Sequence, residues 1–241
     1  MIASQLDINA VEKTRQRFLQ IRNKSESICE PLQTEDYVAQ PIVDVSPPKW
    51  HLAHTTWFFE TFLLKKYVNA YREFHPKFGF LFNSYYQNIG DRVIRHERGD
   101  LTRPGVEEIY RYRAYINEAM MHFFDHSELY PDECLNIIEL GLQHEQQHQE
   151  LLWADLKYIL GLNPLEPKYS EVSPFIDEKP DTAAGMDFVK IDGGNYKIGF
   201  DGEGFCFDNE LIRHTVYLEP YEIATRLVNN GEYLEFMDAG G

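Results

Sequence analysis

Two histidine-containing segments, about ninety residues apart, constrain the fold of this chain more than any other feature. His144 and His148 are four residues apart, and such residues project from the same face of an α-helix. His51 and His54, in the earlier segment, can supply a third imidazole from a facing helix. Three imidazoles suit iron, zinc, copper or nickel and leave coordination positions open for a substrate. The sequence therefore predicts a catalytic metal site between packed helices.

Spacing alone does not identify the third ligand, because His51 and His54 are three residues apart and helical periodicity excludes neither. Both segments are flanked by apolar residues, so we expect their imidazoles to point into the protein. A buried imidazole needs hydrogen-bond partners, and one metal ion satisfies three imidazoles at once. Glu145 and Glu150 are displaced around the helix from the histidine face, so a carboxylate ligand is less well supported. The simplest alternative is that these histidines only pack and form hydrogen bonds.

The pattern of apolar residues predicts a mainly α-helical first domain, residues 1–161. Start and stop signals and helical periodicity place helices at about residues 7–27, 48–67, 104–126 and 131–160. Four such helices are typical of a four-helix bundle, where metal sites are built from facing helices. Residues 162–187 are rich in proline and are predicted to be a linker. Residues 188–241 contain short strands and turns followed by a short helix, which indicates an incomplete α+β second domain.

Composition limits the partners and the compartment. The chain has 241 residues, 43% of them hydrophobic, and a formal net charge of −16. Nucleic acid and anionic membranes attract clustered Lys and Arg, so we expect neither as a partner. No apolar run approaches the ~20 residues that a membrane span needs, and no signal peptide is recognisable. The cysteines show no paired spacing, as expected for reduced thiols in a cytoplasmic protein.

Two sets of motifs resemble a known enzyme family. Three segments resemble the DinB-like domain of the sulfoxide synthases of ergothioneine biosynthesis: Ser46–Glu60, Leu81–Tyr86 and His144–Glu150. Three further segments resemble the start of a formylglycine-generating-enzyme-like (sulfatase-modifying-factor) domain: Phe188–Gly199, Phe207–Glu210 and Asn230–Phe236. The resemblance extends over nearly the whole chain, and the motifs follow the family's order.

The resemblance implies a mononuclear non-haem iron(II) centre, Fe(II), that uses O2. Enzymes of this family join a thiol, γ-glutamylcysteine or cysteine, to the imidazole C2 of hercynine (trimethylhistidine) and produce a sulfoxide. The family's metal ligands correspond here to His54, His144 and His148, which makes His51 a neighbour of the site. Neutral imidazoles leave the iron its positive charge and open positions for both substrates and O2. Coordination also stabilises a thiolate.

The resemblance also implies how the substrates are held. In the family, two arginines three residues apart bind the carboxylates of the thiol substrate, a task that suits guanidinium groups. Arg95 and Arg98 are the expected pair, although Arg92 and Arg95 have the same spacing and a solvated arginine-rich loop is the simpler alternative. Gln147 corresponds to a position that contacts hercynine, and an ordinary polar helix residue is the competing interpretation.

The second domain of the family is longer than residues 188–241. Its later part supplies a proton-donating tyrosine and aromatic contacts to the trimethylammonium group, so no catalytic acid is assigned in this chain. We therefore expect a truncated synthase that binds metal but has little or no synthase activity. Two other functions stay open: a DinB-like thiol-dependent transferase or hydrolase that uses zinc or nickel, and a non-catalytic helical interaction module.

Overall fold

Helices account for most of the residues that the structure describes. The computed structural model describes residues 8–84, 91–171 and 185–241. The chain divides into two compact units, Met1–Val172 and Ser173–Gly241. Part of the predicted linker, residues 172–184, lies outside the described residues. Within the described ranges, no helix has the length and hydropathy to cross a bilayer.

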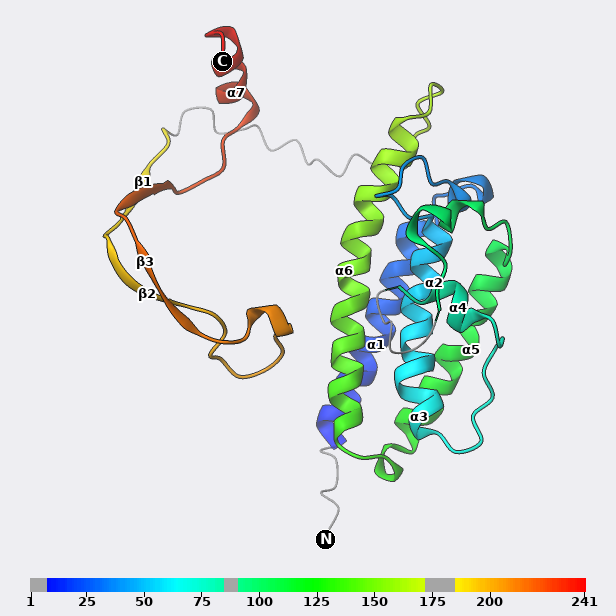
Figure 1. Cartoon of the computed structure of the whole chain (residues 1–241). Helices are drawn as coiled ribbons and strands as arrows, with labels where there is room; N and C mark the ends of the chain where they lie inside the picture. Colours follow the sequence, from blue (N-terminus) through cyan, green and yellow to red (C-terminus); the bar gives the residue numbers. More distant parts are fainter. Residues whose placement is uncertain (1–7, 85–90, 172–184) are drawn as a thin grey trace. The chain divides into compact units, whose positions relative to one another are not determined.

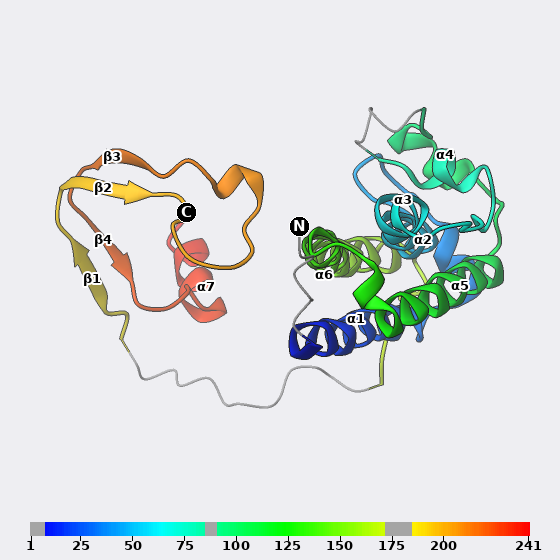
Figure 2. The ribbon, with the colours of Figure 1, turned by 90° about the horizontal axis from the view of Figure 1, so that it is seen from below.

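Four helices of the first unit are long and lie side by side (Figures 1 and 2). They are α1 (Ile8–Cys29), α2 (Pro48–Phe59), α5 (Val106–Asp125) and α6 (Glu133–Gly161). Helices α1 and α2 each pack against both α5 and α6. The four helices predicted from apolar periodicity are therefore confirmed. The second continues beyond α2 through a π-helical turn, η2 (Glu60–Leu64), into α3 (Lys65–Tyr67).

Helix α2 is buried over its whole length. Pro48 occupies its first turn, where a proline costs no hydrogen bond. All the residues of Pro48–Phe59 are buried, because α1, α5, α6 and the short helices η1 (Thr34–Val38) and α4 (Phe78–Phe82) all contact α2. A helix that is covered on every side cannot send its polar groups to water. The polar side chains of α2 must therefore find partners inside the protein.

The glycine in the middle of α6 lets that helix approach α2 closely. A Cβ atom at Gly141 would lie 2.6 Å from the ring of Phe59 and 2.8 Å from the ring of Phe58. Both rings are buried in the core of the unit. Gly141 is three residues before His144, so this close contact brings the histidine face of α6 toward α2.

The described part of the arginine-rich segment between α4 and α5, residues 91–105, contains a short helix. Residues 85–90 lie outside the described residues, and these include Tyr85 and Tyr86 of the segment Leu81–Tyr86. After them, η4 (Arg95–Asp100) forms a 3-10 helix within a segment predicted to be a loop. Another 3-10 helix, η5 (Ser127–Leu129), connects α5 to α6.

The second unit contains two antiparallel strand pairs. Strand β1 (Phe188–Ile191) pairs with β4 (Tyr221–Ala224), and β2 (Gly194–Ile198) pairs with β3 (His214–Leu218). The 3-10 helix η6 (Asp208–Glu210) lies between β2 and β3, and helix α7 (Asn230–Asp238) follows β4. Strands near residues 188, 196 and 215 were predicted, whereas β4 was not. No residue described in this unit is buried, so its strands and helix enclose no core of their own.

Candidate metal centre

Three imidazoles from two facing helices converge inside the first unit. His54 comes from α2, and His144 and His148 come from α6. One ring nitrogen of each lies within 4.8 Å of those of the other two. The Nε2 atoms of His54 and His144 are 3.2 Å apart. Two nitrogens that each lie about 2.1 Å from a shared ion, at octahedral or tetrahedral angles, are roughly 3.0–3.4 Å apart. The three histidines are therefore close enough to hold a metal ion.

The ring of His54 is fixed in place from several sides. Its Nδ1 lies 2.6 Å from the carbonyl oxygen of Phe82, which can only accept a hydrogen bond, so Nδ1 carries the proton. This tautomer leaves the Nε2 lone pair free for a metal. Trp50 and Trp57 stack on the imidazole, with ring centroids 4.5 and 5.5 Å away. They precede and follow His54 by about one helical turn, so the ring is held between two indoles.

His51 contacts the cluster but faces other partners. Its Nδ1 is 2.9 Å from Nδ1 of His148, and its Nε2 is 2.9 Å from a carboxylate oxygen of Asp155. Both ring nitrogens of His51 are therefore occupied within the protein. His54, His144 and His148 therefore form the set of histidines close enough to hold a metal ion, and His51 lies beside it.

The three converging imidazoles are kept neutral by their surroundings. Burial is the largest cause of lowered pKa values at His54, His144 and His148, and it lowers the pKa of His144 to about 4. The neighbouring imidazoles lower the pKa values of His54 and His148 further. A neutral imidazole is the form that binds a metal ion. The donor set therefore fits a metal ion at neutral pH without first losing protons.

Acid should destabilise the metal-free protein from about pH 6.5 downward. In the folded protein, burial lowers the pKa values of His51, His54, His144 and His148 below the ordinary value of 6.5. Below that value the unfolded chain binds more protons than the folded protein, so stability is full above pH 6.5 and falls toward pH 4. Each histidine that stays neutral only when folded contributes about 1.4 kcal/mol per pH unit.

Urea unfolding of the metal-free protein between pH 4.5 and 8 tests this expectation. The midpoint should fall as the pH is lowered through this range. Replacing His144 by Gln should make the dependence shallower, because one buried imidazole is removed. A midpoint that does not change between pH 7 and pH 5 would contradict the prediction.

Arg98 is the arginine that reaches the cluster. It is buried, and its guanidinium carbon lies 3.4 Å from the ring centroid of Trp50, which also stacks on His54. Its two terminal nitrogens donate to the hydroxyl groups of Ser46 and Ser84, at 2.9 and 3.2 Å. Its charge contributes to the lowered pKa values of His54 and His148. Arg98 therefore places a buried positive charge next to the candidate metal centre.

The other residues singled out in the sequence lie in different surroundings. Arg95 is partly exposed, and its guanidinium donates to the carbonyl of Asp44 at 2.6 Å. The two arginines therefore bind different partners, because Arg98 donates to Ser46 and Ser84. Arg92 donates to the carbonyl of Ser84. Gln147 is exposed on α6, about 100° around the helix from His148. The structure therefore brings Arg98 close to the histidines through Trp50, which stacks on His54, and Gln147 only by its place in the chain.

A buried ionic cluster, which the sequence analysis did not identify, joins the helices next to the histidines. Glu145 has no exposed surface and accepts hydrogen bonds from Arg22 and Arg113, both at 3.0 Å, and from Ser25 at 2.7 Å. Burial acts to raise the pKa of Glu145, but the two arginines prevail and hold it at about 2. Arg22 also donates to Thr56 of α2 at 2.9 Å. The cluster therefore connects α1, α2, α5 and α6.

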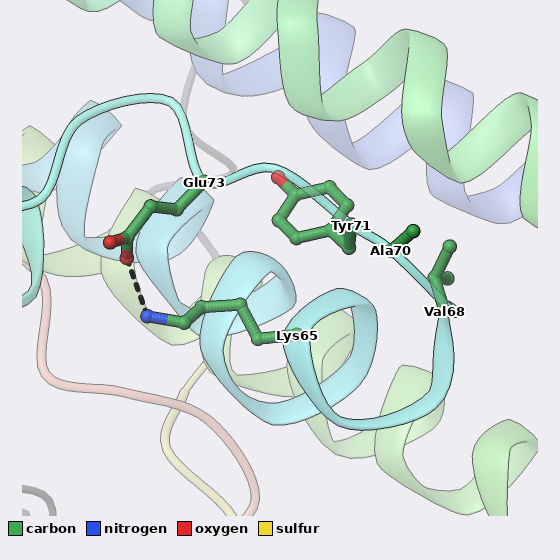
Figure 3. Close-up of a pocket in the computed structure, with 5 residues that line it drawn as sticks. All are labelled: Lys65, Val68, Ala70, Tyr71 and Glu73. Carbon is green, nitrogen blue, oxygen red and sulfur yellow. Dashed lines mark hydrogen bonds and ion pairs between the residues drawn. The ribbon is translucent and has the colours of Figure 1, made fainter.

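A surface hollow of the first unit has no connection with the histidines. It measures about 310 Å3 and is lined by Lys65, Val68, Ala70, Tyr71 and Glu73 (Figure 3). Lys65 and Glu73 form an ion pair there, so the charged groups of the hollow neutralise each other. The hollow therefore offers no set of metal ligands.

The chemistry available at the histidine cluster follows from its donor set. Three neutral imidazoles leave a divalent ion its full charge and open positions, and Arg98 adds a positive charge nearby. Such a site favours an anionic ligand, for example a thiolate or a carboxylate. Comparison with protein-family models found no match to this chain, and comparison with curated proteins found none.

Proposed function

We propose that His54, His144 and His148 bind iron(II), and that the chain belongs to an O2-dependent sulfoxide synthase. The reaction would join γ-glutamylcysteine or cysteine to the imidazole C2 of hercynine. The observation that carries the proposal is the convergence of one ring nitrogen from each histidine within 4.8 Å. The motif resemblance supports the choice of reaction. Bound iron(II) supplies an open coordination site for the thiolate and the redox chemistry with O2.

The protein's own residues would select and orient an anionic substrate. The buried charge of Arg98 favours a thiolate or carboxylate near the histidines. Arg95 is less buried, and its side-chain bond goes to a backbone carbonyl, so exchanging that bond for a substrate carboxylate costs little burial. In this proposal Arg95 and Arg98 bind the thiol substrate, and the exposed amide of Gln147 contacts hercynine.

The same donor set supports one alternative. Three neutral imidazoles also suit zinc or nickel, so a thiol-dependent transferase or hydrolase would use the same ligand geometry. A non-catalytic interaction module is less well supported. A hydrogen bond accounts for the 3.2 Å contact between the Nε2 atoms of His54 and His144, but a shared cation also accounts for the convergence of a nitrogen of His148 on the same place. The identity of the metal therefore separates the two catalytic readings.

Metal analysis and thiol binding test the proposal together. Protein purified without oxygen should contain or take up iron(II). Its cobalt(II) form should gain a near-ultraviolet thiolate-to-metal band when γ-glutamylcysteine or cysteine is added, whereas serine, which lacks the thiol, should give no band. Exclusive binding of zinc or nickel, or no band with either thiol, would contradict the proposal.

Oxygen consumption with iron(II), hercynine and γ-glutamylcysteine measures the reaction itself. We expect little turnover from this polypeptide, because the family's proton donor and the aromatic contacts to hercynine are not assigned in it. The His144→Ala variant gives the background rate. Iron-dependent sulfoxide formation above that background would support the synthase and overturn the expectation of low activity.

A further inference from the structure

We propose that Asp155 and His51 form a hydrogen-bond relay that positions His148 to bind the metal ion, an inference that rests on the proposed metal centre. Nδ1 of His148 lies 2.9 Å from Nδ1 of His51, and Nε2 of His51 lies 2.9 Å from Oδ2 of Asp155. His148 and Asp155 are seven residues apart on α6, which is about two helical turns. The ring of His51 projects from α2 and contacts both of them.

The direction of the hydrogen bonds follows from the groups at the end of the relay. Oδ2 of Asp155 also accepts the backbone N–H of Ser46 at 2.9 Å, so this oxygen acts as an acceptor. Nε2 of His51 therefore carries the proton, and in the neutral imidazole Nδ1 is then the acceptor. His148 must donate from Nδ1. Its Nε2 is left with a free lone pair, and the relay thereby selects the tautomer of His148 that can bind a metal through Nε2.

The relay is confined to a buried and tightly filled region. His51 and Asp155 are both buried, and Trp50 packs edge-on against His51 with ring centroids 5.7 Å apart. The cavity beside the relay, lined in part by Ser25 and Thr55, measures only about 10 Å3. That is roughly the space of a single water molecule. The orientation of His148 is therefore set by His51 and Asp155, with little room for solvent to take their place.

At His54, the acceptor of the Nδ1 proton is a backbone group. The carbonyl of Phe82 accepts the Nδ1 proton of His54, and no side-chain substitution removes that carbonyl. At His148 the outer partner is a side chain, so its contribution can be measured. Partners of this kind typically change metal affinity by about 10–100-fold when they are removed.

Two substitutions of His51 separate positioning of the ligand from mere support of the fold. In His51→Asn the amide lies near the former Nδ1, so it can accept from His148 but cannot reach Asp155. In His51→Gln the amide lies near the former Nε2, so it can contact Asp155 but not His148. The test compares the cobalt(II) affinity of each variant, measured by chelator competition, with the thermal midpoint of its metal-free form.

The proposal predicts opposite orders for affinity and stability. Cobalt(II) affinity should fall about 10–100-fold in His51→Gln and stay within about threefold of the unsubstituted protein in His51→Asn. The thermal midpoint should be lower in His51→Asn, because buried Asp155 loses its imidazole partner. If affinity follows thermal stability in both variants, His51 only supports the fold and the proposal is overturned.

The unsubstituted protein provides a test that needs no variant. Nitrogen-15 NMR of the metal-free protein should show His148 protonated at Nδ1 and His51 protonated at Nε2, and the reverse tautomer at His51 overturns the relay. Absence of cobalt(II) binding in the unsubstituted protein would end the proposed metal centre itself. Binding that is equally tight in His51→Gln would remove the relay and leave the metal centre standing.

Discussion

Replacing Glu145 by Ala should lower the free energy of unfolding by about 3–5 kcal/mol, because two buried guanidinium groups lose the carboxylate between them. Arg22, Arg113 and Glu145 have no exposed side-chain surface. Glu26 also contacts Arg113, but it is partly exposed and cannot replace a buried partner. Urea unfolding of the metal-free protein at pH 7 measures the change. The dependence of the unfolding free energy on urea concentration is held equal for the two proteins.

A matched control lies on the same helix. Glu139 of α6 pairs with Arg17, and both side chains are partly exposed. Its replacement by Ala should cost no more than about 1 kcal/mol. Equal losses for the two variants would show that burial of the cluster around Glu145 contributes nothing beyond an ordinary surface ion pair.

Replacing His144 by Ala should weaken metal binding by more than about 100-fold, since loss of a ligand should exceed the effect of losing an outer partner. His144 supplies one of the three converging nitrogens, and its Nε2 lies 3.2 Å from that of His54. Chelator competition with cobalt(II) measures the affinity, and circular dichroism confirms that the helices are intact.

His122 and His126 provide the control for this second prediction. They have the same four-residue spacing as the α6 pair and their rings stack, but both are exposed near the end of α5. His126→Ala should leave the cobalt(II) affinity unchanged. If this variant weakens binding as much as His144→Ala does, the converging cluster does not hold the metal.

The long helices could be predicted because their sequences carry period and boundary signals. Pro48 marks the start of α2, and Gly161 ends α6 as expected. Strand β4 was missed because it is short and directly follows Pro220, which favours a turn. Spacing identified the candidate histidines, but the exposed pair on α5 has the same spacing. Burial therefore decides which pair can form a site, and burial depends on tertiary packing.

The position of Glu145 shows why periodicity was not sufficient for the rest of the site. It is displaced from the histidine face of α6, as predicted, and was therefore not expected to be a metal ligand. However, α6 packs against both α1 and α2, so it has two inward faces, and Glu145 lies on the second. Conversely, Leu151 and Trp153 were expected to flank a buried segment and are 45% and 39% exposed. A single helix sequence does not reveal how many neighbours cover it.

The choice between His51 and His54 also depended on distant residues. Phe82 fixes His54 and Asp155 engages His51, and neither partner is near in sequence. Arg22 left a weak signal that could have been used, because it lies four residues after Phe18 on the apolar face of α1. An arginine in such a stripe indicates a buried anionic partner.

The two indoles around His54 have a consequence for the fluorescence of the protein. Of the three tryptophans in the chain, Trp50 and Trp57 stack directly on this imidazole. Trp153 packs instead against Tyr169 and is partly exposed. An ion with unpaired electrons at Nε2 of His54 would quench the emission of the two stacked indoles, while Trp153 would supply a steady background. The intrinsic fluorescence of the chain would thus report whether such an ion is bound at the three histidines.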